Sequence, residues 1–295
     1  MHEKNLGANL RAEVFEAHRP HLRAVAHRML GSLAEADDAV QETWLRASAA
    51  EVGEVRNIGG WLTTITTRTC LNALRSRAAR REEDLPTAHG SDRPDGGPTP
   101  EQEVEAADAV GIALLVVLDT LTPDERLAFV LHDLFALPFD EIAATLERTP
   151  AAARQLASRA RRRVRGTAPA APDSSRQKQA VTAFLAATRT GDFEALVALL
   201  HPDVVLTADP AVIPTPEPVV VLGAHTVAKG AMAATGRARF TGTALLDGAY
   251  GLAMAPHGRL RLVLTFTLHP DSGLITAVDV IAEAERLGAV EVAVA

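Results

Sequence analysis

The sequence predicts a multidomain protein, with two all-α modules followed by an α+β domain that has a curved antiparallel sheet. Apolar residues recur at helical spacing through the first half of the chain, whereas short β-rich runs replace them after Val204. Two segments rich in proline and small residues interrupt these patterns and predict linkers at 82–107 and 167–175. They leave modules at 10–81, 108–166 and 176–295.

Composition narrows the class of protein. The chain has 295 residues, is 47% hydrophobic and carries a formal net charge of −7. Its length suits two or three hydrophobic cores. A single cysteine, Cys70, excludes an intramolecular disulfide and a cysteine-clustered zinc site. Because the N-terminus is polar and no apolar run approaches about 20 residues, we expect a cytoplasmic protein outside the membrane, without metal or cofactor.

The first module is predicted to be helical throughout. Its first helix has an apolar face formed by Phe15, Leu22, Val25, Ala26 and Met29. The next helix, 33–47, turns Val40, Trp44 and Ala47 inward and presents a mostly acidic face of Asp37, Asp38, Gln41 and Glu42.

A third helix begins at Trp61 and differs from its neighbours in charge. Residues 56–81 contain six arginines and no carboxylate. Four threonines stand among the first seven residues of the helix, although threonine is a mediocre helix former. Hydroxyl and amide side chains beside arginines suit contacts to a sugar–phosphate backbone and to base edges. The polar side chains that share this face of the helix are Thr64, Thr67, Arg68, Asn72 and Arg75. The alternative to a DNA-binding face is an ordinary face exposed to solvent.

The second module ends in the pattern of a helix-turn-helix. Thr149 can cap the second helix of the pair, and Pro150 suits its first position. From Arg148 to Arg165 there are seven arginines and no acidic residue. The face that packs inward consists of Ala153, Leu156, Ala157, Ala160 and Val164. A helix that packs through its apolar face and exposes a basic face can enter a major groove of DNA. The alternative is a basic surface helix of an ordinary helical domain, which would carry the same charge.

Two earlier helices of this module are expected to support the pair. Thr122, Pro123 and Glu125 predict a capping box at the start of the helix that precedes the pair. The apolar segment 111–119 predicts another helix, which we expect to pack behind the helix-turn-helix.

The third module changes from helices to strands. Residues 179–204 predict a helix, a Gly-Asp turn and a second helix, and strand-like runs follow from Val204, interrupted by a short helix at 225–235. The acids and bases of this module show no spacing that demands catalysis, so no catalytic residue is assigned; they are His201, Asp209, His225 and Asp279.

Residues 10–166 together resemble an extracytoplasmic-function sigma factor of bacterial RNA polymerase. The strings DDAVQETWLRA (37–47) and WLTTITTRTCLNALRSR (61–77) are similar to the polymerase-binding and minus-10 helices of sigma region two. Residues 121–164 are similar to region four, which recognises the minus-35 element. The resemblance implies core RNA polymerase and promoter DNA as partners, and promoter-specific initiation as the function.

The resemblance also assigns roles to residues. Contacts to polymerase would come from Asp37, Asp38, Gln41, Glu42 and Trp44. Contacts at the minus-10 element would come from Trp61, Thr64, Thr67, Arg68, Asn72, Arg75 and Arg77. Contacts at the minus-35 element would come from Thr149, Arg154, Gln155, Ser158, Arg159, Arg161, Arg162 and Arg165. Residues 82–119 hold ten acids against one base, which suits the basic channels that this linker follows in sigma factors.

Residues 176–295 resemble SnoaL-like domains, in which helices and a curved sheet enclose a pocket. The similarity lies mainly in residues 191–209, whereas the proline-rich segment 209–218 departs from the related sigma factors. The fused domain is expected to modulate activity, with room for a small ligand in its pocket. Three alternatives stay open: a ligand-sensing helix-turn-helix regulator, an operator-binding repressor, and a SnoaL-like enzyme joined to a DNA-binding module.

Overall fold

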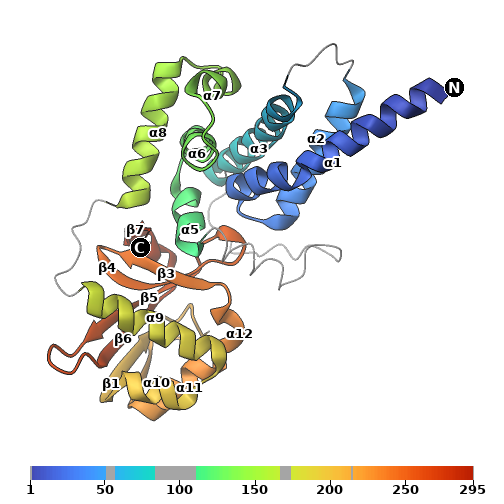
Figure 1. The fold of residues 1–295 in the computed structure, drawn as a ribbon. Helices are drawn as coiled ribbons and strands as arrows, with labels where there is room; N and C mark the ends of the chain where they lie inside the picture. The colour runs from blue at the N-terminus through green and yellow to red at the C-terminus, as the bar shows by residue number, and fades with distance from the viewer. Residues whose placement is uncertain (1, 51–56, 84–110, 167–173, 214, 295) are drawn as a thin grey trace. The chain divides into compact units, whose positions relative to one another are not determined.

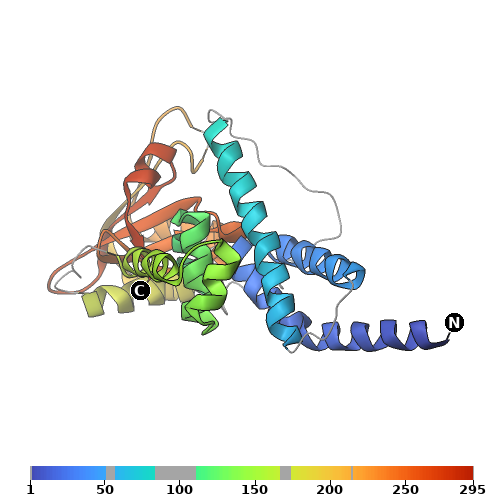
Figure 2. The same ribbon diagram turned by 90° about the horizontal axis from the view of Figure 1, so that it is seen from above.

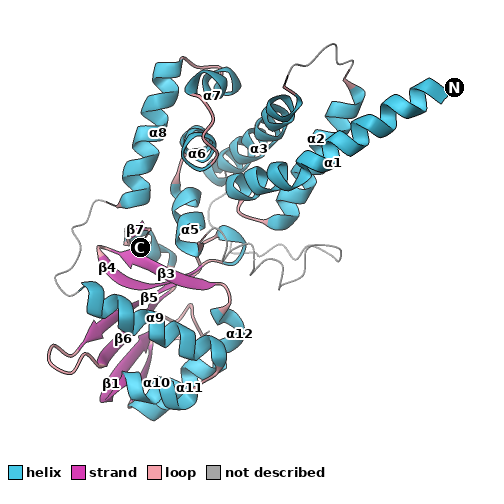
Figure 3. Ribbon diagram, in the orientation of Figure 1, coloured by secondary structure: helices cyan, strands magenta, loops and turns pink. Residues whose placement is uncertain are grey.

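The computed structural model describes residues 2–50, 57–83, 111–166, 174–213 and 215–294 (Figure 1). The chain forms two compact units. A helical unit comprises Met1–Glu103 and Thr120–Arg161, and a sheet unit comprises Val104–Asp119 and Arg162–Ala295. Figure 3 shows that the described strands all belong to the sheet unit. Most of the two predicted linkers lies outside the described residues.

Three helices open the helical unit, as predicted: α1 (His2–Leu30), α2 (Leu33–Ala49) and α3 (Ile58–Glu83). They pack against one another, and α3 crosses the other two (Figure 2). Leu22, Val25 and Met29 of α1 are fully buried in their core. The Ser32 hydroxyl accepts from the N–H of Glu35 and caps α2, which fixes where that helix starts.

The helix-turn-helix lies in the same unit. Helix α6 (Pro123–Phe129) continues into a π-helical turn, η1 (Val130–Leu134), and is followed by α7 (Phe139–Leu146) and α8 (Pro150–Arg165). The predicted capping box is present, since Thr122 and Glu125 exchange hydrogen bonds at the start of α6. Glu147 ends α7 in the left-handed conformation, and the Thr149 hydroxyl accepts from the N–H of Ala152 at 3.2 Å. Both local predictions are confirmed.

The sheet unit begins with α9 (Ser174–Thr190) and α10 (Phe193–Leu199). Two short helices, α11 (Ala224–Ala233) and α12 (Thr235–Ala238), follow the second strand. The described strands form a seven-stranded sheet in the order β2-β1-β6-β5-β4-β3-β7. They are β1 (Leu200–Ala208), β2 (Val219–Leu222), β3 (Thr241–Leu246), β4 (Ala249–Met254), β5 (Leu262–Leu268), β6 (Ile275–Ile281) and β7 (Val292–Ala293).

The sheet is mixed, and not antiparallel as the sequence suggested. Strand β1 pairs in parallel with β6, while the other pairs are antiparallel. This pairing joins segments about seventy residues apart, which local patterns do not reveal. The 3₁₀ turn η2 (Pro256–Gly258), α13 (Ala284–Ala289) and the short β7 were also not predicted.

Helices cover both faces of this sheet. Helices α9 to α11 cover one face, where Phe184, Leu196 and Val227 enter the core (Figure 1). The other face packs against α5 (Ile112–Thr120), through Ile112 and Val116.

Helix α5 packs on the sheet through Ile112, Ala113 and Val116, which is a partner that the sequence did not predict. Six of its nine residues are buried, namely Ile112, Ala113, Leu115, Val116, Val117 and Leu118. A helix that is apolar around most of its circumference has no single buried face in its sequence, so its partner could not be assigned from periodicity.

Candidate nucleic-acid interface

Helix α8 separates a small apolar back from a basic front. Ala153, Ala157 and Ala160 are completely buried, and their small size lets the helix lie close to its neighbours. The exposed side carries no acidic residue, and it includes Arg154, Gln155, Ser158, Arg159, Arg162 and Arg165. The predicted minus-35 residues therefore share one accessible surface, apart from Thr149, whose hydroxyl caps the helix, and the half-buried Arg161.

Three arginines of α8 are held by groups of the helical unit. The Arg159 Nε lies 3.1 Å from a Glu125 carboxylate oxygen, and the Arg161 Nε lies 2.6 Å from that of Asp133. The Arg154 guanidinium lies 5.5 Å from the centre of the Phe139 ring. These contacts orient the arginines while leaving the front of the helix open.

A second basic surface lies on α3. Arg68, Asn72 and Arg75 are exposed and follow one another at intervals of four and three residues, so they line one face as predicted. Trp61 and Thr64 are half-buried beside the start of this helix.

The structure corrects one predicted minus-10 residue, Thr67, and places a second, Arg77, in an ion pair. Thr67 is 0% exposed, and its hydroxyl donates to the Thr63 carbonyl at 2.9 Å. Arg77 pairs with Glu35 of α2 at 3.0 Å, with its side chain largely covered. Thr67 is therefore covered, whereas Arg77 is engaged by Glu35 and keeps 18% of its side chain exposed.

The threonines of α3 explain the correction at Thr67. Thr63, Thr66 and Thr67 are buried, and each hydroxyl donates to the carbonyl four residues earlier. Thr43 of α2 also donates to the Thr66 hydroxyl at 3.1 Å. Threonine can bury its methyl group once a backbone carbonyl satisfies its hydroxyl, so a threonine-rich helix need not present a polar face.

Within the helical unit, α3 contacts α6 through charged groups. Asp124 accepts from the Arg75 Nη2 at 2.9 Å and lies 3.7 Å from that of Arg148. A separate contact joins α6 to α1, where the buried guanidinium of Arg126 donates to the carbonyl of Arg28 at 3.2 Å. One carboxylate thus faces an arginine of the α3 surface and another that precedes α8.

A third exposed surface lies on α2. Asp38, Gln41 and Glu42 are exposed there as predicted. Asp37 instead pairs with Arg23 at 2.6 Å, and Trp44 packs on Phe15 with ring centres 5.0 Å apart.

Sequence reasoning missed Leu45 on this α2 surface. Its side chain is 59% exposed, and it lies one turn beyond Gln41 and Glu42. Its position out of phase with the buried Val40, Thr43 and Ala47 was the signal that could have identified it.

Asp209 has a structural role in the sheet unit. Asp209 is 2% exposed and anchors the segment before α13, because its carboxylate accepts from the N–H groups of Ala282 and Glu283 and pairs with Arg286. Burial raises the pKa of the Asp209 carboxyl, but these donors outweigh burial and hold that pKa below its ordinary value.

The remaining candidates lie apart from the cavity of this unit. Among the described residues that line the cavity there is no Asp, Glu, His, Cys, Lys or Tyr, so His201, His225 and Asp279 do not reach it. In the described part of the chain, no helix combines the length and apolar character needed to cross a membrane.

Comparison with known proteins places these surfaces in a family. Residues 14–80 match the family model Sigma-70 region 2, and residues 112–164 match Sigma-70, region 4. The ECF RNA polymerase sigma factor SigJ of Mycobacterium tuberculosis is 45% identical over 66% of this chain and 64% of its own length, just under two thirds. The probable ECF sigma factor SigI of the same species is 38% identical over 72% of this chain and 73% of its own.

A solved structure gives a further comparison. The crystal structure of M. tuberculosis SigJ aligns over 94% of this chain and 98% of that chain, with 32% identity and a TM-score of 0.45.

Proposed function

Because the chain belongs to the extracytoplasmic-function (ECF) RNA polymerase sigma factors, we propose that it binds core RNA polymerase in the cytoplasm and directs initiation at specific promoters. Helix α8 would occupy the major groove at the minus-35 element, and α3 would contact the minus-10 element. The observation that carries the proposal is the basic front of α8, where the exposed arginines stand on a buried backing of alanines.

The position of each residue along α8 and α3 predicts the part of the promoter that it would contact. Arg154, Gln155, Ser158 and Arg159 lie toward the N-terminal part of α8, which reaches base edges in this class of motif. Arg162 and Arg165 follow one turn later and would hold phosphate. On α3, the exposed set Arg68, Asn72 and Arg75 would contact the minus-10 element.

The α2 surface would bind polymerase. Exposed acidic and amide groups surround an exposed leucine there, which suits an interface with an apolar centre and a charged rim. We therefore add Leu45 to the predicted contacts Asp38, Gln41 and Glu42.

Internal carboxylates would compete with DNA for the same arginines. Asp124 and Glu125 pair with Arg75 and Arg159, respectively, so these arginines exchange an internal carboxylate for phosphate or a base when DNA binds. The Arg75–Asp124 pair is partly exposed and is worth about 0–1 kcal/mol, which is small enough to be reversible. The Glu125 side chain is only 5% exposed, so separating it from Arg159 would cost more.

The sheet unit would modulate this activity by holding part of region four. The region-four match begins at residue 112, inside α5, and α5 packs on the sheet of the C-terminal domain. Only Leu121 and Thr122 separate α5 from α6. The N–H of Val294 also donates to the Val164 carbonyl in the last turn of α8, at 3.0 Å.

The alternatives find less support. Sigma factors are not enzymes, and the described residues that line the cavity of the sheet unit include no Asp, Glu, His, Cys, Lys or Tyr. A repressor would explain α8 but would leave the α2 and α3 surfaces and the region-two match without a role.

Arginine variants test the proposal in a transcription assay with core polymerase. Arg154→Ala should cost about 1–3 kcal/mol at promoters with the preferred base and nothing at promoters where that base is changed. Arg162→Ala should weaken all promoters alike and reduce the salt slope of binding by about one unit. Arg259→Ala, an exposed arginine of the sheet unit, is the charge control. An equal loss at every promoter for Arg154→Ala would refute its base contact.

A further inference from the structure

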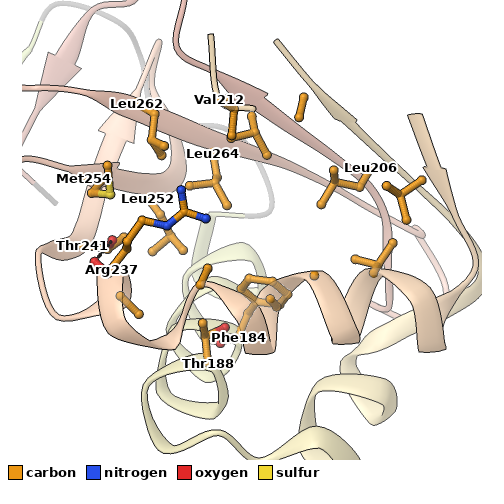
Figure 4. A pocket seen from close by; sticks show the side chains of 18 of the residues that line it. Phe184, Thr188, Leu206, Val212, Arg237, Thr241, Leu252, Met254, Leu262 and Leu264 are labelled. Atoms are coloured by element: carbon orange, nitrogen blue, oxygen red, sulfur yellow. Dashed lines mark hydrogen bonds between the residues drawn. The ribbon is translucent and has the colours of Figure 1, made fainter. Parts of the chain in front are cut away.

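The sheet unit contains a cavity of about 200 Å³ between α9, α11 and α12 on one side and the sheet on the other (Figure 4). Its walls are almost entirely apolar. Phe184 lies on the helix side, and Leu252, Met254, Leu262 and Leu264 lie on the sheet side. Water gains few hydrogen bonds in such a space, so an apolar molecule is favoured there.

One charged group lines this cavity among the described residues. Figure 4 shows the Arg237 guanidinium extending from α12 toward the leucines of the sheet. In the described part of the chain, no hydrogen bond, ion pair or ring contact engages that guanidinium. Arg189, by contrast, donates to the carbonyls of Ala238 and Thr241. Arg237 is exposed, which places its charge at the mouth and the apolar walls deeper inside.

From this geometry we propose that the cavity binds a small apolar carboxylate, with its hydrocarbon part among the leucines and its carboxylate paired with Arg237. A cavity of 150 Å³ accepts benzene, so about 200 Å³ suits roughly eight to ten non-hydrogen atoms, such as an aryl-acetate or a medium-chain fatty acid. Arginine favours carboxylates because its planar donors match the two oxygens.

The same strands that line the cavity also hold α5. Leu252 and Met254 of β4 face the cavity, whereas the alternate residues Ala253 and Ala255 pack with α5 on the opposite face. On β5, Leu262 and Leu264 face the cavity and Val263 faces α5. The ligand site and the first helix of region four therefore lie back to back across a single sheet.

This juxtaposition gives the ligand a route to the DNA-binding module. A ligand that spreads or tightens β4 and β5 would change the packing of α5 by the same movement. Coupling of this kind is reciprocal. If the ligand changes the equilibrium constant for packing α5 on the sheet by some factor, then loosening α5 must change the affinity of the cavity for the ligand by the same factor. This step rests on the proposed modulating role of the sheet unit, whereas ligand binding itself does not.

Calorimetric titration of the full-length protein, without polymerase or DNA, tests the ligand class. The probes are phenylacetate and octanoate, each beside the neutral alcohol of equal length, 2-phenylethanol and 1-octanol. We expect the acids to bind about tenfold more tightly than the alcohols, because the acids gain a charged hydrogen bond at an exposed arginine. Arg237→Met should abolish this difference and leave the affinity for the alcohols unchanged.

Two further variants complete the test. Arg239→Met removes an arginine two residues away that does not line the cavity, and it should keep the preference for acids. Ala231→Phe fills the cavity and should abolish binding of both acids and alcohols. Equal affinity for acid and alcohol in the unaltered protein, a preference that survives Arg237→Met, or no binding of any probe at millimolar concentration would each overturn the proposal.

The coupling to α5 has a separate readout. Gly242→Val, which crowds α5 from β3, should change the affinity for octanoate, and octanoate should change hydrogen exchange of the α5 amides in the unaltered protein. If octanoate binds through Arg237 but neither quantity changes, the ligand site stands and the route to α5 is wrong.

Discussion

Gly242→Val is the sharpest perturbation of the contact between α5 and the sheet. A Cβ atom at Gly242 would lie 2.9 Å from the Ile112 Cβ, closer than side-chain carbons approach in folded proteins. The two residues must move apart, and α5 is the element that can move. Overpacking of this kind costs about 1–3 kcal/mol. The preference of valine for strands returns up to about 1 kcal/mol, so we expect a net loss of about 1–2 kcal/mol.

This loss is a fraction of the burial that holds α5 on the sheet. Burial of Ile112 and Val116 stabilises the contact by at most about 6 kcal/mol in total. Hydrogen exchange measured by mass spectrometry should therefore show the α5 amides opening about five to thirty times more often in the variant. Amides of β1, none of whose residues belongs to the core around α5, serve as the internal reference. Gly288→Val is the matched control, because a Cβ there meets nothing within 4 Å.

The same variant connects packing to function. If the sheet unit modulates region four through α5, Gly242→Val should change transcript yield, while Gly288→Val should not. This comparison is cleaner than deletion of residues 176–295, which would uncover the apolar side of α5. The packing of α5 on β3 would be refuted if the α5 amides exchanged hydrogen at the same rate in Gly242→Val, in Gly288→Val and in the unaltered protein.

Three further predictions concern the helical unit. Leu45→Asp should weaken binding to core polymerase by about tenfold if the leucine lies at the centre of the interface. Because Leu45 is exposed, the same variant should change the free energy of unfolding by less than about 0.5 kcal/mol. An unchanged affinity for polymerase would show that Leu45 is not part of the interface. Burial and three neighbouring arginines lower the pKa of His27 from 6.5 to about 4, so the unfolded chain binds a proton that the native protein excludes between these values. The free energy of unfolding should fall by about 3 kcal/mol as pH drops from 6.5 to 4, and urea titrations of His27→Leu should lack this part of the pH dependence. Burial raises the pKa of Cys70 to about 12, so a thiol reagent should label the unfolded protein at neutral pH but not the native one; rapid native labelling would contradict the buried position.

Local signals in the sequence predicted the local structure well. The capping box at Thr122, the cap at Thr149 and the alanine stripe of α8 depend on neighbouring residues only, and all three are present. The change from helices to strands after Val204 also follows from periodicity, because strands and helices bury residues at different intervals.

Contacts between residues far apart in the sequence could not be predicted from these local signals. The parallel pairing of β1 with β6 and the packing of α5 on the sheet are long-range contacts without a local pattern. The burial of Thr67 follows from hydroxyls that bond to the preceding turn, which makes a polar residue compatible with a core. Leu45 was missed because an exposed leucine looks like any apolar residue until its phase is compared with the buried face.

Initiation by purified core RNA polymerase is the decisive test of a sigma-factor function for this protein. The measurement is transcription from a randomised promoter library, with and without the full-length protein, followed by sequencing of the transcript starts. We predict new starts that share one minus-35 and one minus-10 sequence, and that disappear when the basic front of α8 is neutralised. Binding to promoter DNA without any new start by core polymerase would contradict the assignment as a promoter-specificity subunit.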